Sequence, residues 1–217
     1  VVSFFTNNAN IDEFRPSEYE LNHEIDRWLI SRSNTLIKDV RKGLDDLEVH
    51  KSTQAIEDFI DDLSNWYLRR RRRRFWEGSD AEKESAYNTL YDTLKTLTKV
   101  MAPFTPYLSE RLYQNILLPM EDGPESVHML EYPQVDEEKM DEDLEENMDT
   151  VIKIAELGRN ARQKENIKLR QPLKEAIVVE LESKAEKAVE QFKDILKDEL
   201  NVKELIVYED ESELTET

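Results

Sequence analysis

The sequence predicts a mainly α-helical protein, in which a helical bundle is followed by a small α+β unit. Hydrophobic residues make up 38% of the 217 residues and charged residues 36%, with only 4 Gly and 7 Pro, a composition typical of helical proteins. No proline lies between Pro16 and Pro103, and the apolar residues of this stretch recur at helical spacing. After Leu173 the pattern changes to strand, helix and strand.

Three long helices are expected in the proline-free stretch. The first spans residues 25–47, where apolar residues at intervals of three, four or seven form one stripe. The second spans residues 52–78 and ends with a glycine. The third opens with Ser79 and Glu82 at the spacing of a capping box, and it stops before Pro103.

Two further helices complete the expected bundle. A short fourth helix starts with Thr105 as cap and Pro106 at the first helical position, and it should bury Leu108. After a surface connection, a long fifth helix is expected at 136–165. Gly158 continues its apolar stripe, which indicates close packing against another element.

The end of the chain has a different pattern. Two β-rich runs, EAIVVEL and VKELIVYE, flank the amphipathic helical run SKAEKAVEQFKDILKDEL. This order predicts a small α+β unit that begins after the turn at 170–173. The acidic residues 210–217 are expected to be a disordered tail.

The charge balance restricts the partners that the protein can have. Thirty Lys and Arg against 49 Asp and Glu give a formal charge of −19, so a polyanion could bind only at a local basic patch. The chain has no cysteine and its three histidines are scattered, so no metal site is expected. No apolar run is long enough to span a bilayer and no signal peptide is visible, so we expect a cytoplasmic protein without a membrane partner.

The most unusual motif is a row of six arginines, Arg69 to Arg74, in the run NWYLRRRRRRFW. At about 100° per residue, Arg70 and Arg74 continue the apolar stripe of the second helix, so they should be structural and meet carboxylates or helix carbonyls of neighbouring helices. Arg69, Arg72 and Arg73 should lie on the outer face, with Arg71 on the other flank. Guanidinium groups bind phosphates and stack on bases, which makes the outer arginines and the neighbouring Trp76 candidate RNA-binding residues.

A second basic stretch adds weight to the RNA hypothesis. Five cations occur between residues 159 and 170, and all five are candidate RNA contacts: Arg159, Arg162, Lys164, Lys168 and Arg170. Arg162 also falls on the apolar stripe of the fifth helix, so a structural role for it is equally open. The chain contains no Gly-rich phosphate loop and no nucleophile beside a histidine, so binding is favoured over catalysis and no catalytic residue is assigned.

Five sequence blocks, in this order and at these separations, resemble the C-terminal part of isoleucyl-tRNA synthetases: EIDRWLISRSNTLI, LSNWYLRRRRRRFW, APFTPYLSERLYQNI, SVHMLEYP and GRNARQKENIKLRQPL. The blocks at 26–31 and 102–106 are shared with the valyl relatives. The aromatic and arginine pattern from Trp66 to Trp76, together with KLRQPL, favours isoleucine. Arg71 extends an arginine pattern that is usually interrupted in the family, so it receives no role from the resemblance.

The resemblance implies a domain order. Residues 1–16 would be the connection from a catalytic domain, 17–168 a helical-bundle anticodon-binding domain, 169–209 a small α+β junction unit and 210–217 the acidic tail. The implied partners are tRNA, specifically tRNA-Ile, and the catalytic domain of the same polypeptide.

The parent enzyme would be an isoleucine–tRNA ligase that uses ATP and magnesium. No block matches the HIGH and KMSKS signatures of its catalytic domain, so we expect this chain alone to be inactive and to hold no cofactor. Two alternatives stay open: the same region of a valyl-tRNA synthetase, and a helical protein-interaction module whose arginine row pairs with an acidic partner.

Overall fold

The computed structural model describes residues 1–9, 14–179 and 183–208, without the side chains of residues 70–73 and 183–184. The chain divides into two compact units, Val1–Asp141 and Glu142–Thr217. This division falls before the last long helix, whereas the domain limits expected from the sequence are 17–168 and 169–209. Those limits stay a prediction, and the expected tail lies outside the described residues.

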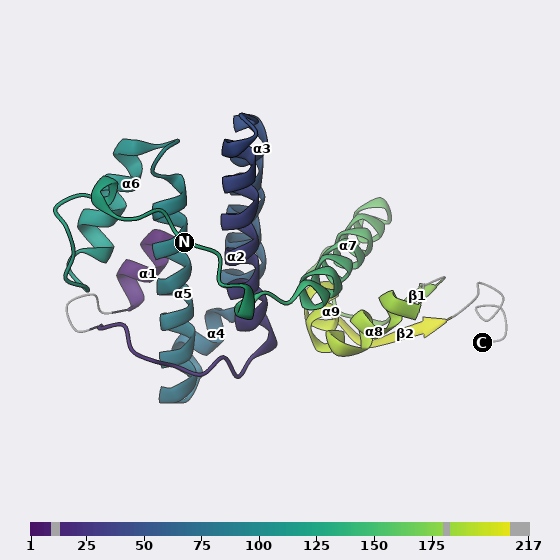
Figure 1. Cartoon of the computed structure of the whole chain (residues 1–217). Coiled ribbons are helices and arrows are strands. Elements are labelled where there is room, and N and C mark those ends of the chain that lie inside the picture. Colours follow the sequence, from purple (N-terminus) through teal and green to yellow (C-terminus); the bar gives the residue numbers. More distant parts are fainter. Residues whose placement is uncertain (10–13, 180–182, 209–217) are drawn as a thin grey trace. The chain divides into compact units, whose positions relative to one another are not determined.

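The first unit is a helical bundle (Figure 1). Helix α2 (Glu24–Asp45) packs along α3 (Val49–Asp61) and α5 (Asp80–Met101). A π-helical segment (Asp62–Leu68) joins α3 without a break to α4 (Arg69–Glu77). The largest fully buried side chains of the bundle include those of Trp28, Tyr67 and Tyr91.

Shorter elements surround these helices. Helix α1 (Val2–Asn8) buries Phe5 completely, and α6 (Pro106–Leu112) is followed by a π-helical turn (Tyr113–Leu117). The connection that follows contains two single 3-10 turns, Val127–Met129 and Glu137–Lys139.

The segment before α2 runs along α5 and is bound to it by polar groups. The hydroxyl of Tyr19 donates to Oδ2 of Asp92 at 2.8 Å, and the hydroxyl of Ser85 donates to the carbonyl of Glu20 at 3.0 Å. Burial raises the pKa of the Asp92 carboxyl above its ordinary value, although the bond from Tyr19 partly opposes this shift. The segment is therefore part of the bundle's polar packing.

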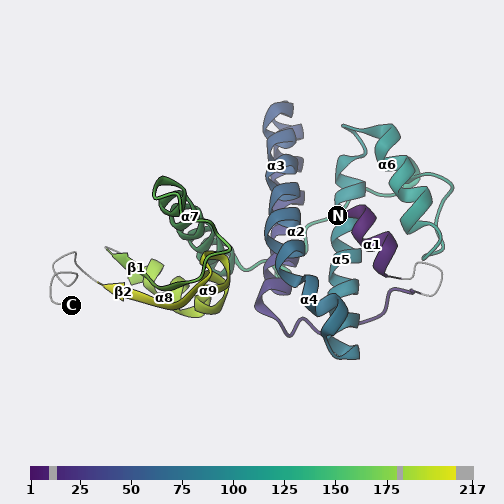
Figure 2. The same ribbon diagram turned by 180° about the vertical axis from the view of Figure 1, so that it is seen from behind.

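The second unit is a β–α–β arrangement with one additional helix (Figure 2). Helix α7 (Glu142–Lys164) precedes β1 (Leu173–Val179), α8 (Ser183–Gln191), α9 (Lys193–Leu200) and β2 (Val202–Tyr208). The two strands are parallel and in register from Leu173 opposite Val202 to Val179 opposite Tyr208. A parallel pair requires a crossover connection, and α8 and α9 provide it.

The structure confirms the predicted fold class: the described residues are mainly helical, and their strands occur only at Leu173 and beyond. The capping box of Ser79 and Glu82 is present. Helix α7 starts at Glu142 instead of residue 136, because the N–H groups of Asp136 and Asp141 bond to side chains of α2 and hold the intervening chain out of the helix.

The structure confirms Thr105 at the N-cap position and Pro106 at the start of the fourth helix, α6, but the predicted burial of Leu108 is wrong. Leu108 is 48% exposed instead of buried. The Thr105 hydroxyl makes no capping bond to the backbone of α6; it donates to the carbonyl of Met101 at 3.3 Å and lies 3.4 Å from the hydroxyl of Ser109.

Candidate RNA-binding surfaces

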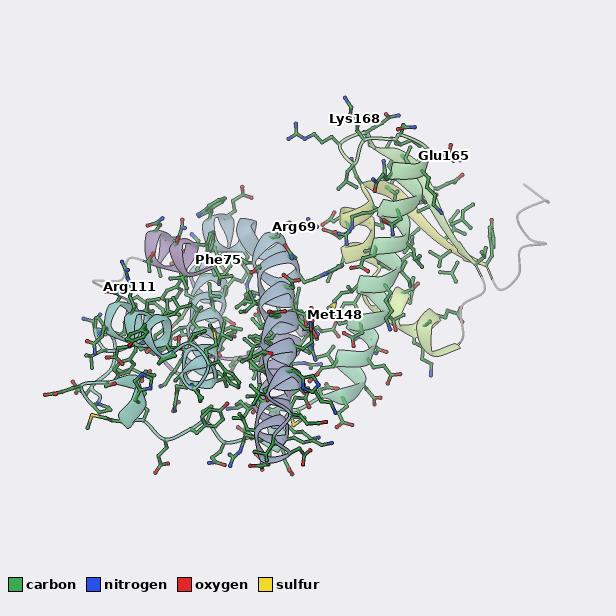
Figure 3. The ribbon with its side chains drawn as sticks, turned by 90° about the horizontal axis from the view of Figure 1, so that it is seen from above. Arg69, Phe75, Arg111, Met148, Glu165 and Lys168 are labelled. Carbon is green, nitrogen blue, oxygen red and sulfur yellow. The ribbon has the colours of Figure 1, made fainter. Side chains whose placement is uncertain are left out.

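The arginine row forms most of α4, directly after the π-helical segment. Trp66, Tyr67 and Leu68 at the end of that segment are 5%, 0% and 8% exposed, so the backbone enters α4 from the core of the bundle. Arg69 and Phe75 lie on different sides of this helix (Figure 3). Phe75 is 2% exposed, and its ring packs against Tyr87 of α5 at a centroid distance of 4.9 Å.

The last arginine of the row is part of the bundle core. Arg74 is 8% exposed, and its Nη1 donates to Oδ2 of Asp26 on α2 at 2.5 Å. Asp26 is fully buried, and its Oδ1 accepts a second hydrogen bond from the hydroxyl of Tyr67 at 2.9 Å. The structure therefore places Arg74 on the inward face that its helical position predicts, with a buried carboxylate as partner.

Outer side chains are described at the start of the arginine row and just after its end, and both are exposed. Arg69 is exposed, and Trp76 is 54% exposed. The Nε1 of Trp76 donates to Oδ1 of Asn8 at 3.0 Å, and its ring lies 6.2 Å from that of Phe4, so α1 holds the indole in place while leaving half of it open. A fixed and half-open indole is suited to stacking on an unpaired base.

The middle of the row cannot be assigned from the structure. Residues 70–73 are helical, but the predicted inward position of Arg70 and outward positions of Arg72 and Arg73 concern side chains outside the described ones. These three assignments stay predictions.

In the second unit, Arg162 is not on the surface. It is 6% exposed, and its guanidinium donates to four main-chain carbonyls: from Nη1 to Lys168 at 3.2 Å and Gln171 at 3.0 Å, and from Nη2 to Leu200 at 2.6 Å and Asn201 at 3.1 Å. It thus joins the connection after α7 to the turn between α9 and β2. This placement is at odds with the RNA contact predicted for Arg162, because the donors that would bind a phosphate are used inside the unit.

Arg159 also makes a bond inside the second unit. Its Nη1 donates to Oε2 of Glu199 on α9 at 2.6 Å, and 29% of its side chain is exposed. One turn of the helix lies between Arg159 and Arg162, and Gly158 beside it approaches α9 closely. A Cβ at Gly158 would lie 2.4 Å from Cδ2 of Leu200, which agrees with the expected close packing.

The other three cations of this stretch are exposed. Lys164 ends α7, and Lys168 and Arg170 lie in the connection to β1. Lys168 projects from the unit in Figure 3. The stretch from residue 159 to residue 170 therefore offers three exposed cations, while the buried arginine fixes the connection on which two of them stand.

Within residues 1–9, 14–179 and 183–208, no group of three or more His, Cys, Asp or Glu side chains could hold a metal ion. Across the same described part of the chain, none of the helices is long and apolar enough to cross a membrane.

Sequence reasoning did not identify the acidic partners of Arg74 and Arg159. Asp26 lies between apolar residues at inward positions of α2, and a carboxylate on an apolar face is a signal for a buried cation nearby. Glu199 is 8% exposed and shows the same pattern near the end of α9. Neither residue could be matched to its arginine without knowing which helices are neighbours.

Comparison with known proteins gives a family match across both units. The family described as the anticodon-binding domain of tRNA ligase matches residues 26–178.

An isoleucine–tRNA ligase of Dehalococcoides mccartyi strain CBDB1 is 46% identical over 215 residues, covering 96% of this chain and 21% of that protein. One from Pyrococcus horikoshii is 43% identical over 212 residues, covering 95% of this chain and 20% of that protein. One from Picrophilus torridus is 50% identical over 180 residues, covering 82% and 17%. The chain thus spans about a fifth of the length of the curated relatives it matches.

Proposed function

Because the chain belongs to the family of anticodon-binding domains of tRNA ligases, we propose that it is the tRNA-binding portion of an isoleucine–tRNA ligase. The observation that carries this proposal is the family match over residues 26–178 together with relatives of 43% to 50% identity that are named isoleucine–tRNA ligase. Those names support the isoleucyl assignment over the valyl alternative. The ligand would be the anticodon stem-loop of tRNA-Ile.

The length of the relatives supports a separation between tRNA binding in this chain and catalysis elsewhere in the polypeptide. The catalytic domain that attaches isoleucine with ATP and magnesium would lie in the part of the polypeptide outside this chain. We therefore expect no isoleucine-dependent exchange of pyrophosphate into ATP by the purified 217-residue chain. Measurable exchange would contradict this assignment.

The proposed RNA contacts in the first unit are on the outer face of α4: Arg69, Arg72, Arg73 and Trp76. The exposure of Arg69 and of half the Trp76 ring supports their part of this proposal. Arginine supplies charge-assisted bidentate bonds to phosphates, which fix position and give affinity without reading sequence. Trp76 would stack on an unpaired base of the loop.

In the second unit the proposed contacts are Lys164, Lys168 and Arg170, with Arg159 in a lesser role because Glu199 already pairs with it. Arg162 is not among the proposed contacts, because it is buried and its guanidinium donates to main-chain carbonyls. The net charge of −19 disfavours nucleic acid over most of the surface, so these local cations would also determine where tRNA binds.

A salt titration of tRNA binding tests the proposal. We expect Arg72→Ala combined with Arg73→Ala to weaken tRNA-Ile binding and to reduce the slope of log affinity against log salt by up to about two units, because each lost phosphate contact releases one fewer counterion. The matched control is Lys42→Ala combined with Lys51→Ala. It removes the same charge from exposed positions at the far end of the α2–α3 hairpin, away from α4 (Figure 1).

An equal loss in both double variants would mean that only net charge matters and that α4 is not the RNA surface. Unchanged binding in the α4 variant, together with a much lower melting temperature, would make the row structural. If the unchanged chain itself bound no tRNA even at low salt, the protein-interaction alternative would be favoured instead.

A further inference from the structure

A groove in the second unit is unexplained by tRNA binding. It has a volume of about 630 Å³ and lies between α7 and β1. Its walls include Leu157 and Ala161 of α7 and most of β1, with Leu200 and Val202 at one end. In Figure 2, β1 lies on the side of β2 that faces α7.

The groove follows the edge of β1 instead of one face of the sheet. Five successive residues of the strand, Glu175 to Val179, line it. Successive side chains of a strand point to opposite faces, so a cavity over one face would contact only every second residue. A cavity that all five residues line therefore reaches the strand's backbone, as expected of one that follows its edge.

The peptide groups along this edge can accept another strand. Among the described strands, β1 has β2 as its neighbour on one side. The N–H of Leu173 donates to the carbonyl of Asn201 at 3.1 Å, and in a parallel pair every second residue bonds to the same neighbour. By this alternation Lys174, Ala176 and Val178 direct their N–H and C=O groups away from β2, and Ala176 and Val178 are among the residues that line the groove.

The lining favours an apolar peptide over RNA. Leu157 is 68% exposed and Ile177 is 41% exposed. Of the described residues that line the groove, Arg162 carries the positive charge, and its donors are bonded to carbonyls, whereas Glu165 and Glu175 are carboxylates that repel phosphate. An open strand edge beside apolar side chains is the arrangement that binds an extended segment by strand addition.

We propose that an extended segment of the same polypeptide, from outside this 217-residue chain, fills the groove and pairs with β1 as a third strand. This inference rests on the proposed function, because the curated ligases of which the chain spans 21% and 20% leave most of their length outside it. A tethered segment is present at high effective concentration, so a groove of this size suffices to hold it. A third strand would also pair the N–H and C=O groups of β1 that face away from β2.

Amide hydrogen exchange in the 217-residue chain and in the complete polypeptide tests this inference. In the short chain, we expect slow exchange at the amides of Glu175 and Ile177, which face β2, and fast exchange at Ala176 and Val178. In the complete polypeptide, Ala176 and Val178 should exchange at least about a hundredfold more slowly, while Glu175 and Ile177 change little. The readout involves no tRNA, so it can fail while tRNA binding succeeds, and the reverse.

A proline pair provides a second test. Ala176→Pro removes an N–H that faces the groove, so it should be tolerated in the short chain but should lower the melting temperature of the second unit in the complete polypeptide. The matched control Ile177→Pro removes an N–H that faces β2, and it should destabilise both proteins.

Three results would overturn the inference. Fast exchange at Ala176 and Val178 in the complete polypeptide would show that no strand pairs there. Slow exchange in the dilute short chain would place the occupant within residues 1–217. Slow exchange that depends on concentration, with a dimer in sedimentation, would make a second copy the occupant.

Discussion

Among the described side chains, each unit buries one arginine from a basic run, but the two arginines are satisfied in different ways. Arg74 in the bundle meets a fully buried carboxylate, Asp26, which also accepts a bond from Tyr67. Arg162 in the second unit donates instead to four main-chain carbonyls, including those of Leu200 and Asn201. Arg74 and Asp26 form a pair of opposite charges. Arg162 is a single cation that is stabilised by the dipoles of carbonyl groups in two connections.

The difference determines what is lost when the arginine is removed. Without Arg74, the charge of Asp26 stays buried with only a hydroxyl donor, and an uncompensated buried charge is among the most costly defects in a protein. Without Arg162, carbonyl groups lose a donor but carry no full charge, and those near the surface can bind water instead. The two arginines therefore predict a graded series of effects.

The largest effect is expected from Arg74→Met. We expect a loss of about 3 to 5 kcal/mol in the free energy of unfolding of the bundle, because Asp26 loses its cation. All three tryptophans, Trp28, Trp66 and Trp76, lie in the bundle, so denaturation followed by tryptophan fluorescence reports this unit alone.

The double variant Arg74→Met with Asp26→Asn is the matched control for that prediction. Removing both charges should recover a large part of the loss, since no isolated charge stays buried. If the losses of the two single variants simply add, the pairing of Arg74 with Asp26 does not explain the stability of the bundle.

The next effect is expected from Arg162→Met. We expect about 2 to 3 kcal/mol of destabilisation in the second unit, since charge-assisted hydrogen bonds to buried acceptors are lost. Far-UV circular dichroism should show an earlier transition that tryptophan fluorescence does not follow. Arg162→Lys keeps the charge but cannot reach four carbonyls with a planar fork, so it should recover only part of the loss. Full recovery by lysine would mean that charge alone matters at this site.

A smaller effect is expected from Gly158→Ala. The added methyl group would meet Leu200, so we expect a loss of about 1 to 3 kcal/mol through overpacking, reduced by the better helix propensity of alanine. Thermal melts of the second unit measure it. In the background of Leu200→Ala, which opens the space, the same substitution should become neutral or stabilising. A loss that persists there would contradict the close-packing explanation.

The smallest effect on stability is expected from the exposed cations Lys164 and Lys168. Their alanine variants should each change the free energy of unfolding by no more than about 0.5 kcal/mol, because both side chains stand in solvent. In tRNA titrations at low salt, the order of the effects should be the reverse of their order for stability. The Lys164 and Lys168 variants should weaken binding, whereas a folded Arg162→Lys protein should bind tRNA as the unchanged chain does. If Arg162→Lys weakens tRNA binding and the two lysine variants do not, Arg162 is an RNA contact after all.

Local patterns in the sequence determined much of this protein. Helical spacing between Pro16 and Pro103 predicted the helices of the bundle, and the change to β-like runs after Leu173 predicted the strands. The capping box at Ser79 and the inward position of Arg74 could also be predicted, because helix caps and helix faces depend on residues three or four positions apart.

Only the tertiary structure decided which side chains meet. The pairing of Arg74 with Asp26 joins residues 48 positions apart, and that of Arg162 with Leu200 joins residues 38 apart, so neither follows from local spacing. The sequence thus determined which residues are basic, but burial, which depends on neighbouring elements, decided which of them can reach a ligand.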